Sequence, residues 1–131
     1  MRRVARITVG PRVSKYGAKR TVVDGMTFHS QKEARRYQEL KLLEKAGVIE
    51  AVECQPRFEL LVCKVTGQPA YPTITLPHVV IGRYIADFQY YDRRSCERVV
   101  EDVKSPPTRT PIYRWKVKHL KAQYGIEVRE V

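Results

Sequence analysis

The sequence contains few of the features that stabilise small proteins by means other than a hydrophobic core. Only three of its 131 residues are cysteines, and they form neither a Cys-x-x-Cys pair nor a Cys/His ligand spacing. This argues against a disulfide framework and against a structural zinc site, so we expect free, mostly buried thiols at Cys54, Cys63 and Cys96. No apolar run approaches the roughly 20 residues that span a bilayer, and no secretory peptide is recognisable. These absences favour a cytoplasmic protein without a membrane anchor.

Acidic residues are absent from the start of the chain, and the whole sequence is strongly basic. The formal net charge is +11, and residues 1–20 contain basic side chains only among their charged residues. A field of this sign concentrates polyanions, which favours nucleic acid as the partner. The alternative interpretation is that the charge only keeps the protein soluble. The residues expected to bind DNA phosphates are Arg2, Arg3, Arg12, Lys15, Lys19, Arg20, Arg114, Lys118 and Lys121.

Turn and capping signals predict one folded domain over residues 20–131, preceded by a basic arm over residues 1–19. Asp24-Gly25 lies between two β-prone runs and is typical of a hairpin turn, which needs positive φ. The residues SQKE that begin at Ser30 match a helix capping box, and the helix should end at Gly47. This is the clearest helix signal in the sequence.

The rest of the chain predicts strands and one further helix. Residues 57–65 form a strand, residues 66–82 a long loop or irregular hairpin, and the runs RYIADFQYY and CERVVEDVK an antiparallel hairpin that turns at residues 92–95. A helix should follow over residues 111–124, before the strand IEVREV. The order predicts an α/β (α+β) fold, in which helices pack on a mixed sheet.

Two carboxylates interrupt the apolar strands of the predicted hairpin. Burying a carboxylate is unfavourable unless it is paired or bound to a cation, and Asp87 and Asp102 both face this problem. Strand alternation places Asp102 and Lys104 on one face and Glu101 on the other. With the predicted turn, Asp87 pairs with Val100, so that Asp102 becomes its diagonal neighbour. The side chains of Asp87, Asp102 and Lys104 should therefore converge.

This group of side chains suits metal-dependent phosphate chemistry. Carboxylate oxygens are ligands for Mg²⁺ or Mn²⁺, and a bound cation polarises a phosphate oxygen. The ammonium of Lys104 could orient water or stabilise the charge that grows on the phosphate in the transition state. The alternative interpretation is a surface hairpin with an ordinary Asp-Lys pair.

The order of Asp87, a spacer and Asp102-Val103-Lys104 resembles the pattern of PD-(D/E)XK nucleases, with Ala86 in the place of the proline in that name. The blocks KYGAKRTVVDGMTFHSQKEARRYQEL, QPRFEL, YIADFQYY, VVEDVKS and YRWKVKHLKAQYGIEVREV are similar to short phage and prophage proteins, whose layout resembles that of Holliday-junction resolvases and of the Tn7-type transposase endonuclease subunit. The resemblance implies a restriction-endonuclease-like fold and a Mg²⁺-dependent DNA endonuclease that leaves 5′-phosphates. It also implies action on branched DNA as a homodimer, in the bacterial host cytoplasm if phage-encoded, without a small-molecule cofactor.

The resemblance further implies that Glu33 joins Asp87 and Asp102 at the metal, whereas the alternative is that Glu33 only completes the capping box. Gln55 lies in a shared block and is predicted to line the site, although its role could be structural. Lys116, on the helix that follows Lys104, is also predicted to line it.

Three interpretations therefore stay open at the level of sequence. For Tyr113 and Trp115 in the last helix, core packing is favoured over stacking on bases. A non-catalytic nucleic-acid-binding accessory protein would keep the fold without cleavage. An RNA-directed nuclease would use the same metal chemistry, because that chemistry does not read the sugar.

Overall fold

The structure is a computed structural model that describes residues 19–64, 67–70 and 77–131. The predicted DNA contacts Arg2, Arg3, Arg12 and Lys15 lie outside the described residues. No helix in the described part of the chain is long and apolar enough to cross a membrane. The elements are β1 (Thr21–Val23), β2 (Met26–Phe28), α1 (Gln31–Lys45), β3 (Ile49–Cys54), β4 (Arg57–Cys63), β5 (His78–Ile85), β6 (Phe88–Asp92), β7 (Glu97–Asp102), the 3₁₀ turn η1 (Pro106–Thr108), α2 (Pro111–Tyr124) and β8 (Val128–Glu130).

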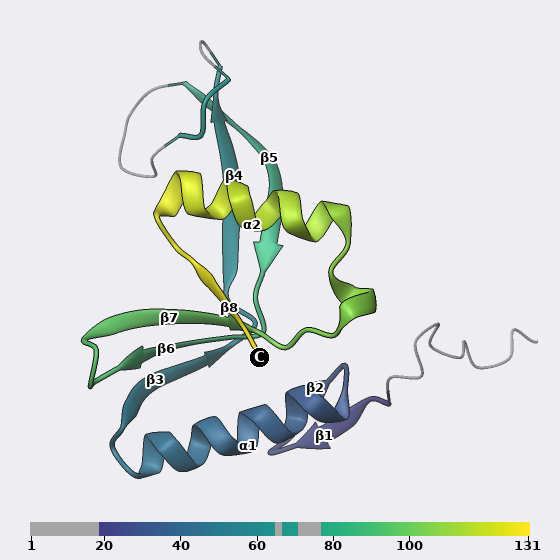
Figure 1. Cartoon of the computed structure of the whole chain (residues 1–131), viewed down its shortest axis with the longest axis vertical. Coiled ribbons are helices and arrows are strands. Elements are labelled where there is room, and N and C mark those ends of the chain that lie inside the picture. The colour runs from purple at the N-terminus through teal and green to yellow at the C-terminus, as the bar shows by residue number, and fades with distance from the viewer. Residues whose placement is uncertain (1–18, 65–66, 71–76) are drawn as a thin grey trace, which may run out of the picture.

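The predicted α+β fold is confirmed. The largest sheet has the strand order β3-β6-β7-β8, and β7 and β8 run parallel while its other neighbours are antiparallel. The strands β4 and β5 pair with each other, and Figure 1 shows this pair as an arm that rises away from the larger sheet. A small hairpin, β1-β2, precedes α1 and turns at Asp24-Gly25 as predicted, because both residues take positive φ.

The arm and the larger sheet share two strands that bend together. Cys54 faces Phe88 before the bend, and Arg57 faces Ile85 after it, so the pairing register continues unchanged. At the bend itself, the N–H of Gln55 donates to the carbonyl of Asp87 over 2.9 Å. We call this feature, residues 49–63 paired with residues 78–92, the bent ribbon. Its bend is the point at which Asp87 leaves the regular strand.

Helix α1 covers one face of the larger sheet. Ser30 caps it by accepting a hydrogen bond from the N–H of Glu33, as the capping signal predicts. Its buried side chains Ala34, Tyr37 and Leu40 pack in one cluster with Phe28, Phe88, Tyr90 and Val99. The apolar spacing along the helix is therefore explained by a single buried face.

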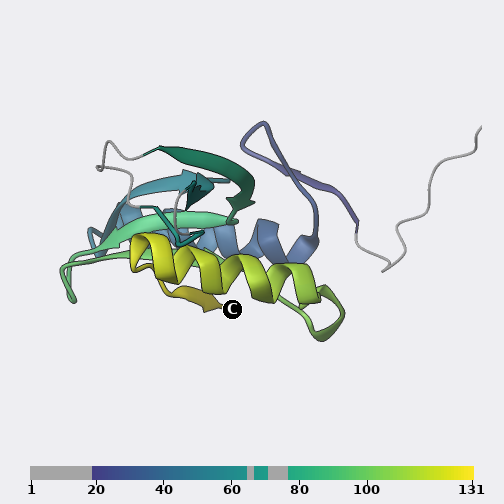
Figure 2. The same cartoon turned by 90° about the horizontal axis from the view of Figure 1, so that it is seen from above.

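Helix α2 covers the opposite side of β7 and packs across the strands of the arm (Figures 1 and 2). Thr110 caps its start, and Gly125 ends it with φ at 69°, a backbone conformation that glycine adopts without strain. Its side chains Tyr113 and Leu120 pack with Val100 of β7 and with Phe58, Leu60, Tyr84 and Ala86. Since Val99 and Val100 are consecutive in a strand, the two helices lie on opposite faces of it.

Glu101 forms the polar centre of the α1 face. It is 0% exposed, and Arg36 of α1 donates two hydrogen bonds to its carboxylate over 2.6 and 3.0 Å. The hydroxyl of Tyr90 donates a third over 2.8 Å. The prediction that Glu101 points away from Asp102 is confirmed, and the ion pair joins α1 to β7.

Four local predictions were wrong. The pairing of β6 with β7 places Gln89, not Asp87, opposite Val100, because the turn begins one residue later than predicted. Strand β5 begins at His78, so part of the predicted loop is extended, and the predicted single strand RYIADFQYY is divided at the bend. The thiols are not mostly buried as expected, because Cys96 is exposed and Cys54 and Cys63 are only half-buried.

Candidate active site

Asp87 and Asp102 lie side by side where the bend meets the end of β7. Asp102 is 1% exposed, and its Oδ1 accepts the N–H of Asp87 over 3.0 Å. In return, Oδ2 of Asp87 accepts the N–H of Val103 over 2.7 Å. The hydroxyl of Tyr84 donates to Oδ2 of Asp102. Each carboxylate is therefore fixed by the main chain that carries the other, and the predicted convergence is confirmed in spite of the wrong register.

The two carboxylates are poorly neutralised. Burial, and then the charge of Asp102, raises the pKa of Asp87 to about 7. The one cation paired with Asp102 among the described residues is Lys104, whose Nζ lies 3.8 Å from Oδ2, which is too long for a hydrogen bond. Lys104 instead stands over the ring of Tyr113, at 4.3 Å from its centroid. The predicted Asp-Asp-Lys group is present, with its ammonium close to the carboxylates but not bonded to them.

A pocket of about 340 Å³ opens beside this group, and Asp102, Lys104 and Lys116 are among the residues that line it. The first turn of α2 lines it too, through Thr110 and Tyr113. The N-terminus of a helix carries partial positive charge and suits anions. Lys116 donates from Nζ to the carbonyl of Arg83 over 2.8 Å, which holds its ammonium at the pocket. Lys116 therefore lines the same pocket as Asp102 and Lys104, and its role at an active site stays a prediction.

The carboxylate of Glu33 is hydrogen-bonded at the start of α1. It accepts hydrogen bonds from the N–H of His29 over 3.1 Å and from the hydroxyl of Ser30 over 3.4 Å. Its charge is one of the smaller influences that raise the pKa of Asp87. Within the described ranges, no three His, Cys, Asp or Glu side chains are grouped so that they could hold a metal. A metal role for Glu33 therefore stays a prediction.

Gln55 contributes its main chain to this region. Its side chain is exposed, and its φ of 53° lies in the left-handed region, where the strand bends. The hydrogen bond from its N–H to the carbonyl of Asp87 supports the backbone of that residue. A structural role for Gln55, the alternative given above, accounts for this geometry. A role for its side chain at the site stays a prediction.

Sequence reasoning missed two residues that hold the site together. In an unbroken strand Tyr84 and Asp87 would point to opposite faces, but the bend at Asp87 breaks that alternation and Tyr84 reaches Asp102. Lys32 of α1 donates from Nζ to the carbonyl of Lys104 over 2.9 Å and to the main-chain oxygen of Val131 over 3.0 Å. Neither contact had a sequence signal, because both depend on how distant elements pack.

The predicted basic contacts within the described residues are all exposed, and these are Lys19, Arg20, Arg114, Lys118 and Lys121. Tyr113 is buried as expected, but the expectation of core packing for Trp115 was wrong, because half of its surface is exposed. The buried stripe of α2 passes through Tyr113 and Leu120, which lie seven residues apart and so share one face. Trp115 falls on the flank of that stripe.

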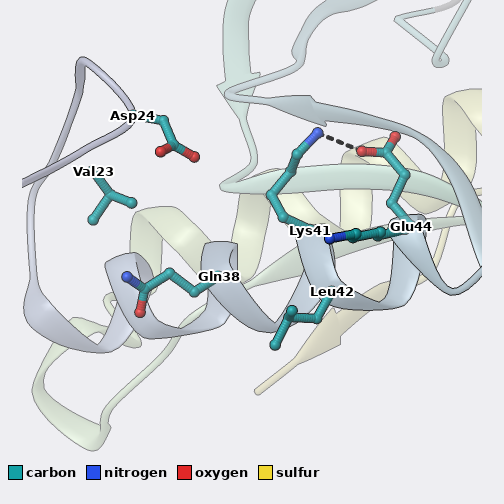
Figure 3. Close-up of a pocket in the computed structure, with 7 residues that line it drawn as sticks. Val23, Asp24, Gln38, Lys41, Leu42 and Glu44 are labelled. Atoms are coloured by element: carbon teal, nitrogen blue, oxygen red, sulfur yellow. Dashed lines mark hydrogen bonds and ion pairs between the residues drawn. The ribbon is translucent and has the colours of Figure 1, made fainter.

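A second and larger hollow, of about 650 Å³, lies between the β1-β2 hairpin and α1. Figure 3 shows Asp24 and Val23 on one side of it, and Leu42 on the helix beside the Lys41-Glu44 ion pair. The acidic residues of this hollow do not form a carboxylate pair like that of Asp87 and Asp102. Size alone does not indicate chemistry, and we place the candidate site at Asp102.

The chain is thus a small α+β protein in which a half-buried and a buried carboxylate, Asp87 and Asp102, lie together at the bend of its sheet. Residues 13–130 match the model of a family described as "Protein of unknown function (DUF1064)", and the chain belongs to this family. No curated protein and no solved structure gives a significant match.

Proposed function

We propose that this protein is a metal-dependent endonuclease that hydrolyses phosphodiester bonds in DNA, with a restriction-endonuclease-like arrangement of the PD-(D/E)XK type. The observation that carries the proposal is the pairing of half-buried Asp87 with buried Asp102, with the ammonium of Lys104 3.8 Å from the second carboxylate. Such a pair is unfavourable for stability, because two like charges lie together with little compensation. A cation bound during function would explain why it is present.

The chemistry of the donors fits Mg²⁺ or Mn²⁺. Magnesium is often held by one or two carboxylates, together with water and substrate phosphates, so two aspartates suffice. No described residue donates a hydrogen bond to Oδ1 of Asp87, whereas every fully buried side-chain nitrogen or oxygen in this part of the chain has a partner. This oxygen is therefore a candidate metal ligand. A bound Mg²⁺ would neutralise the pair and polarise a phosphate oxygen.

The basic groups of the pocket would position the substrate. Lys104 lies next to the carboxylates, where its ammonium would stabilise negative charge on the attacked phosphate or orient the water. Lys116 and the start of α2 would hold a neighbouring phosphate. Attack of water forms a new P–O bond and breaks the bond to the 3′ oxygen, which takes up a proton. The product ends are a 5′-phosphate and a 3′-hydroxyl.

The proposal is tested by cleavage of plasmid, linear duplex, four-way-junction DNA and RNA with Mg²⁺ or Mn²⁺, and with EDTA. Asp102→Asn and Asp87→Asn should each lower the cleavage rate by about 100-fold or more, because each removes a charged ligand. Lys104→Met should do the same while leaving metal affinity, measured by calorimetry, nearly unchanged. Glu97→Gln is the matched control, since Glu97 is an exposed carboxylate on the same strand, and its activity should equal that of the wild type.

Three outcomes decide between this proposal and its rivals. Cleavage that survives in both aspartate variants would overturn the assignment of the site. Tight binding without cleavage on every substrate would support a non-catalytic accessory protein instead. Cleavage of RNA in preference to DNA would support the RNA-directed alternative. Glu33→Gln tests the third predicted ligand, because loss of metal affinity in that variant would show that Glu33 leaves its capping position to bind the cation.

A further inference from the structure

Exposed apolar side chains surround the mouth of the pocket that holds Asp102 and Lys104. Ile85 at the end of β5 is 51% exposed, and Ile112 in the first turn of α2 is 66% exposed. Both of them line that pocket. Trp115, which is 50% exposed, lies one helical turn beyond Ile112. Residues three apart on a helix are surface neighbours, with roughly 5–6 Å between their Cβ atoms. We call Ile85, Ile112 and Trp115 the apolar rim.

The packing of the fold does not account for the apolar rim. The buried stripe of α2 passes through Tyr113 and Leu120, so Ile112 and Trp115 add nothing to the core. The indole of Trp115 is nevertheless held in place, because its ring lies 5.6 Å from that of His119. His119 is itself buried and hydrogen-bonded to the carbonyl of Leu61. Trp115 therefore offers a fixed aromatic face to solvent, which is a favourable arrangement for stacking.

The apolar rim borders a pocket in which three cations outnumber one carboxylate, that of Asp102. Lys104 and Lys116 line the same pocket, and Arg83 adds a third cation at its edge. A ligand that fits must therefore present anionic groups to these cations and a flat apolar surface to the rim. A nucleotide combines both, through its phosphate and its base. In a continuous duplex, however, the faces of the bases are hidden by stacking, and only an unpaired or unstacked nucleotide exposes one.

We propose that the apolar rim binds an unstacked base beside the phosphate that is cut, so that this protein acts on DNA with unpaired nucleotides in preference to continuous duplex. The proposal rests on the proposed nuclease function and names its substrate class. Trp115 supplies the stacking face, while Ile112 acts as an apolar wedge of the kind that separates neighbouring bases. Ile85 closes the pocket from the side of the arm. Lys104 and Lys116 hold the phosphates that flank the base.

The test measures binding without cleavage, so that it does not depend on catalysis. Full-length protein in EDTA is titrated against a duplex, a duplex with a short single-stranded gap, and a single strand, by fluorescence anisotropy. A 2-aminopurine base placed in the gap reports stacking directly through its fluorescence. The wild type should bind gapped DNA about tenfold more tightly than duplex and should change the emission of the 2-aminopurine.

The variants separate base contacts from phosphate contacts. Ile112→Ser and Trp115→Ala should lose most of the preference for gapped DNA, while their affinity for duplex is retained. Arg114→Ala, which removes an exposed charge from the same helix, should weaken binding to gapped DNA and to duplex by the same factor. The matched control is Leu42→Ser, because Leu42 is 68% exposed on α1 in the other hollow (Figure 3), and it should behave like the wild type. Circular dichroism checks that each variant is folded.

The outcomes separate failure of the apolar rim from failure of the proposed function. If the wild type binds gapped DNA no better than duplex, or if Ile112→Ser and Trp115→Ala keep the preference, the inference is overturned even where cleavage with Mg²⁺ is observed. If the preference depends on the rim but no substrate is cut with metal, the nuclease proposal fails and base binding stands. Binding to anionic lipid vesicles that Ile112→Ser abolishes, without any preference for gapped DNA, would assign the apolar rim to a membrane surface instead.

Discussion

Two consecutive residues of β7 carry buried carboxylates, but the groups that neutralise the two charges differ. Glu101 is 0% and Asp102 1% exposed, and they point to opposite faces of the strand. Glu101 receives two hydrogen bonds from Arg36, so its charge is balanced by a cation at hydrogen-bonding distance. Asp102 accepts hydrogen bonds only from neutral groups, the hydroxyl of Tyr84 and the N–H of Asp87. It lies beside a second carboxylate, and the ammonium of Lys104 is 3.8 Å away.

The difference separates a charge that maintains the fold from one that is available for function. A buried carboxylate with a bidentate guanidinium partner has little left to offer to a ligand. A buried carboxylate that repels its neighbour is more stable once a cation arrives, and this is the basis of the nuclease proposal. The comparison can be tested by substituting the carboxylates on each face of β7 in turn and measuring stability rather than activity.

The largest effect is expected on the Glu101 side. Glu101→Gln leaves the guanidinium of Arg36 without its anion, and removing one partner of a buried pair lowers the free energy of unfolding by about 3 kcal/mol. Urea denaturation of the variant and of the wild type gives this difference. The double variant with Arg36→Met should recover part of the loss, since no uncompensated charge then remains. Glu97→Gln is the control, and an equal loss in that variant would contradict the structural role of the ion pair.

A smaller effect is expected from the titration of Asp87. Because burial raises the pKa of Asp87 from 3.8 to about 7, the folded protein binds this proton more tightly than the unfolded chain does. The stability that comes from this proton is fully present below pH 3.8 and is lost as the pH rises through about 7. In chelator, the wild type should therefore lose about 2 kcal/mol relative to Asp87→Asn between pH 5 and pH 8. If the free energies of unfolding of the wild type and of Asp87→Asn differ by the same amount at every pH in this range, the pKa of Asp87 is not raised.

The smallest effect is expected for the stability of Asp102→Asn. The amide keeps an oxygen for the N–H of Asp87 and can donate to the hydroxyl of Tyr84, while the repulsion between the two carboxylates disappears. We expect a change of less than about 1 kcal/mol, of either sign, in metal-free protein. The same variant should lose the stabilisation that Mg²⁺ gives to the wild type. A loss as large as that of Glu101→Gln would mean that both carboxylates serve the fold.

The sequence predicted the elements that have local signals and missed those that depend on distant packing. The hairpin at Asp24-Gly25 and both helix starts were correct, because turn and capping residues act on their own neighbours. The convergence of Asp87 and Asp102 was also predicted, because carboxylates in apolar strands are conspicuous. The contacts from α1 were not, since Lys32 reaches the carbonyl of Lys104, and Arg36 the carboxylate of Glu101, from more than sixty residues earlier in the chain.

The register of β6 with β7 was wrong for a specific reason. The predicted and observed turns both contain four residues, and they differ by one position, which shifts the pairing by two. The observed turn places Cys96 at φ 55°, a conformation that a propensity argument would not choose for cysteine. A signal was present, because the carboxylate of Asp92 accepts the N–H of Arg94, a pattern typical of turn-forming aspartates. A shift by two keeps every side chain on its face, so the convergence of Asp87 and Asp102 survived the error.

The bent ribbon connects the arm mechanically to the two carboxylates. Both of its strands cross from the arm to the larger sheet at one place, and there Gln55 and Asp87 are hydrogen-bonded to each other. If the proposed DNA substrate contacts the arm, a force on the arm would reach Asp87 through its backbone and Asp102 through the hydroxyl of Tyr84 in β5. The position of both carboxylates would then depend on how the arm is held. Under the nuclease proposal, a substrate that binds the arm would therefore influence the site at which it is cut.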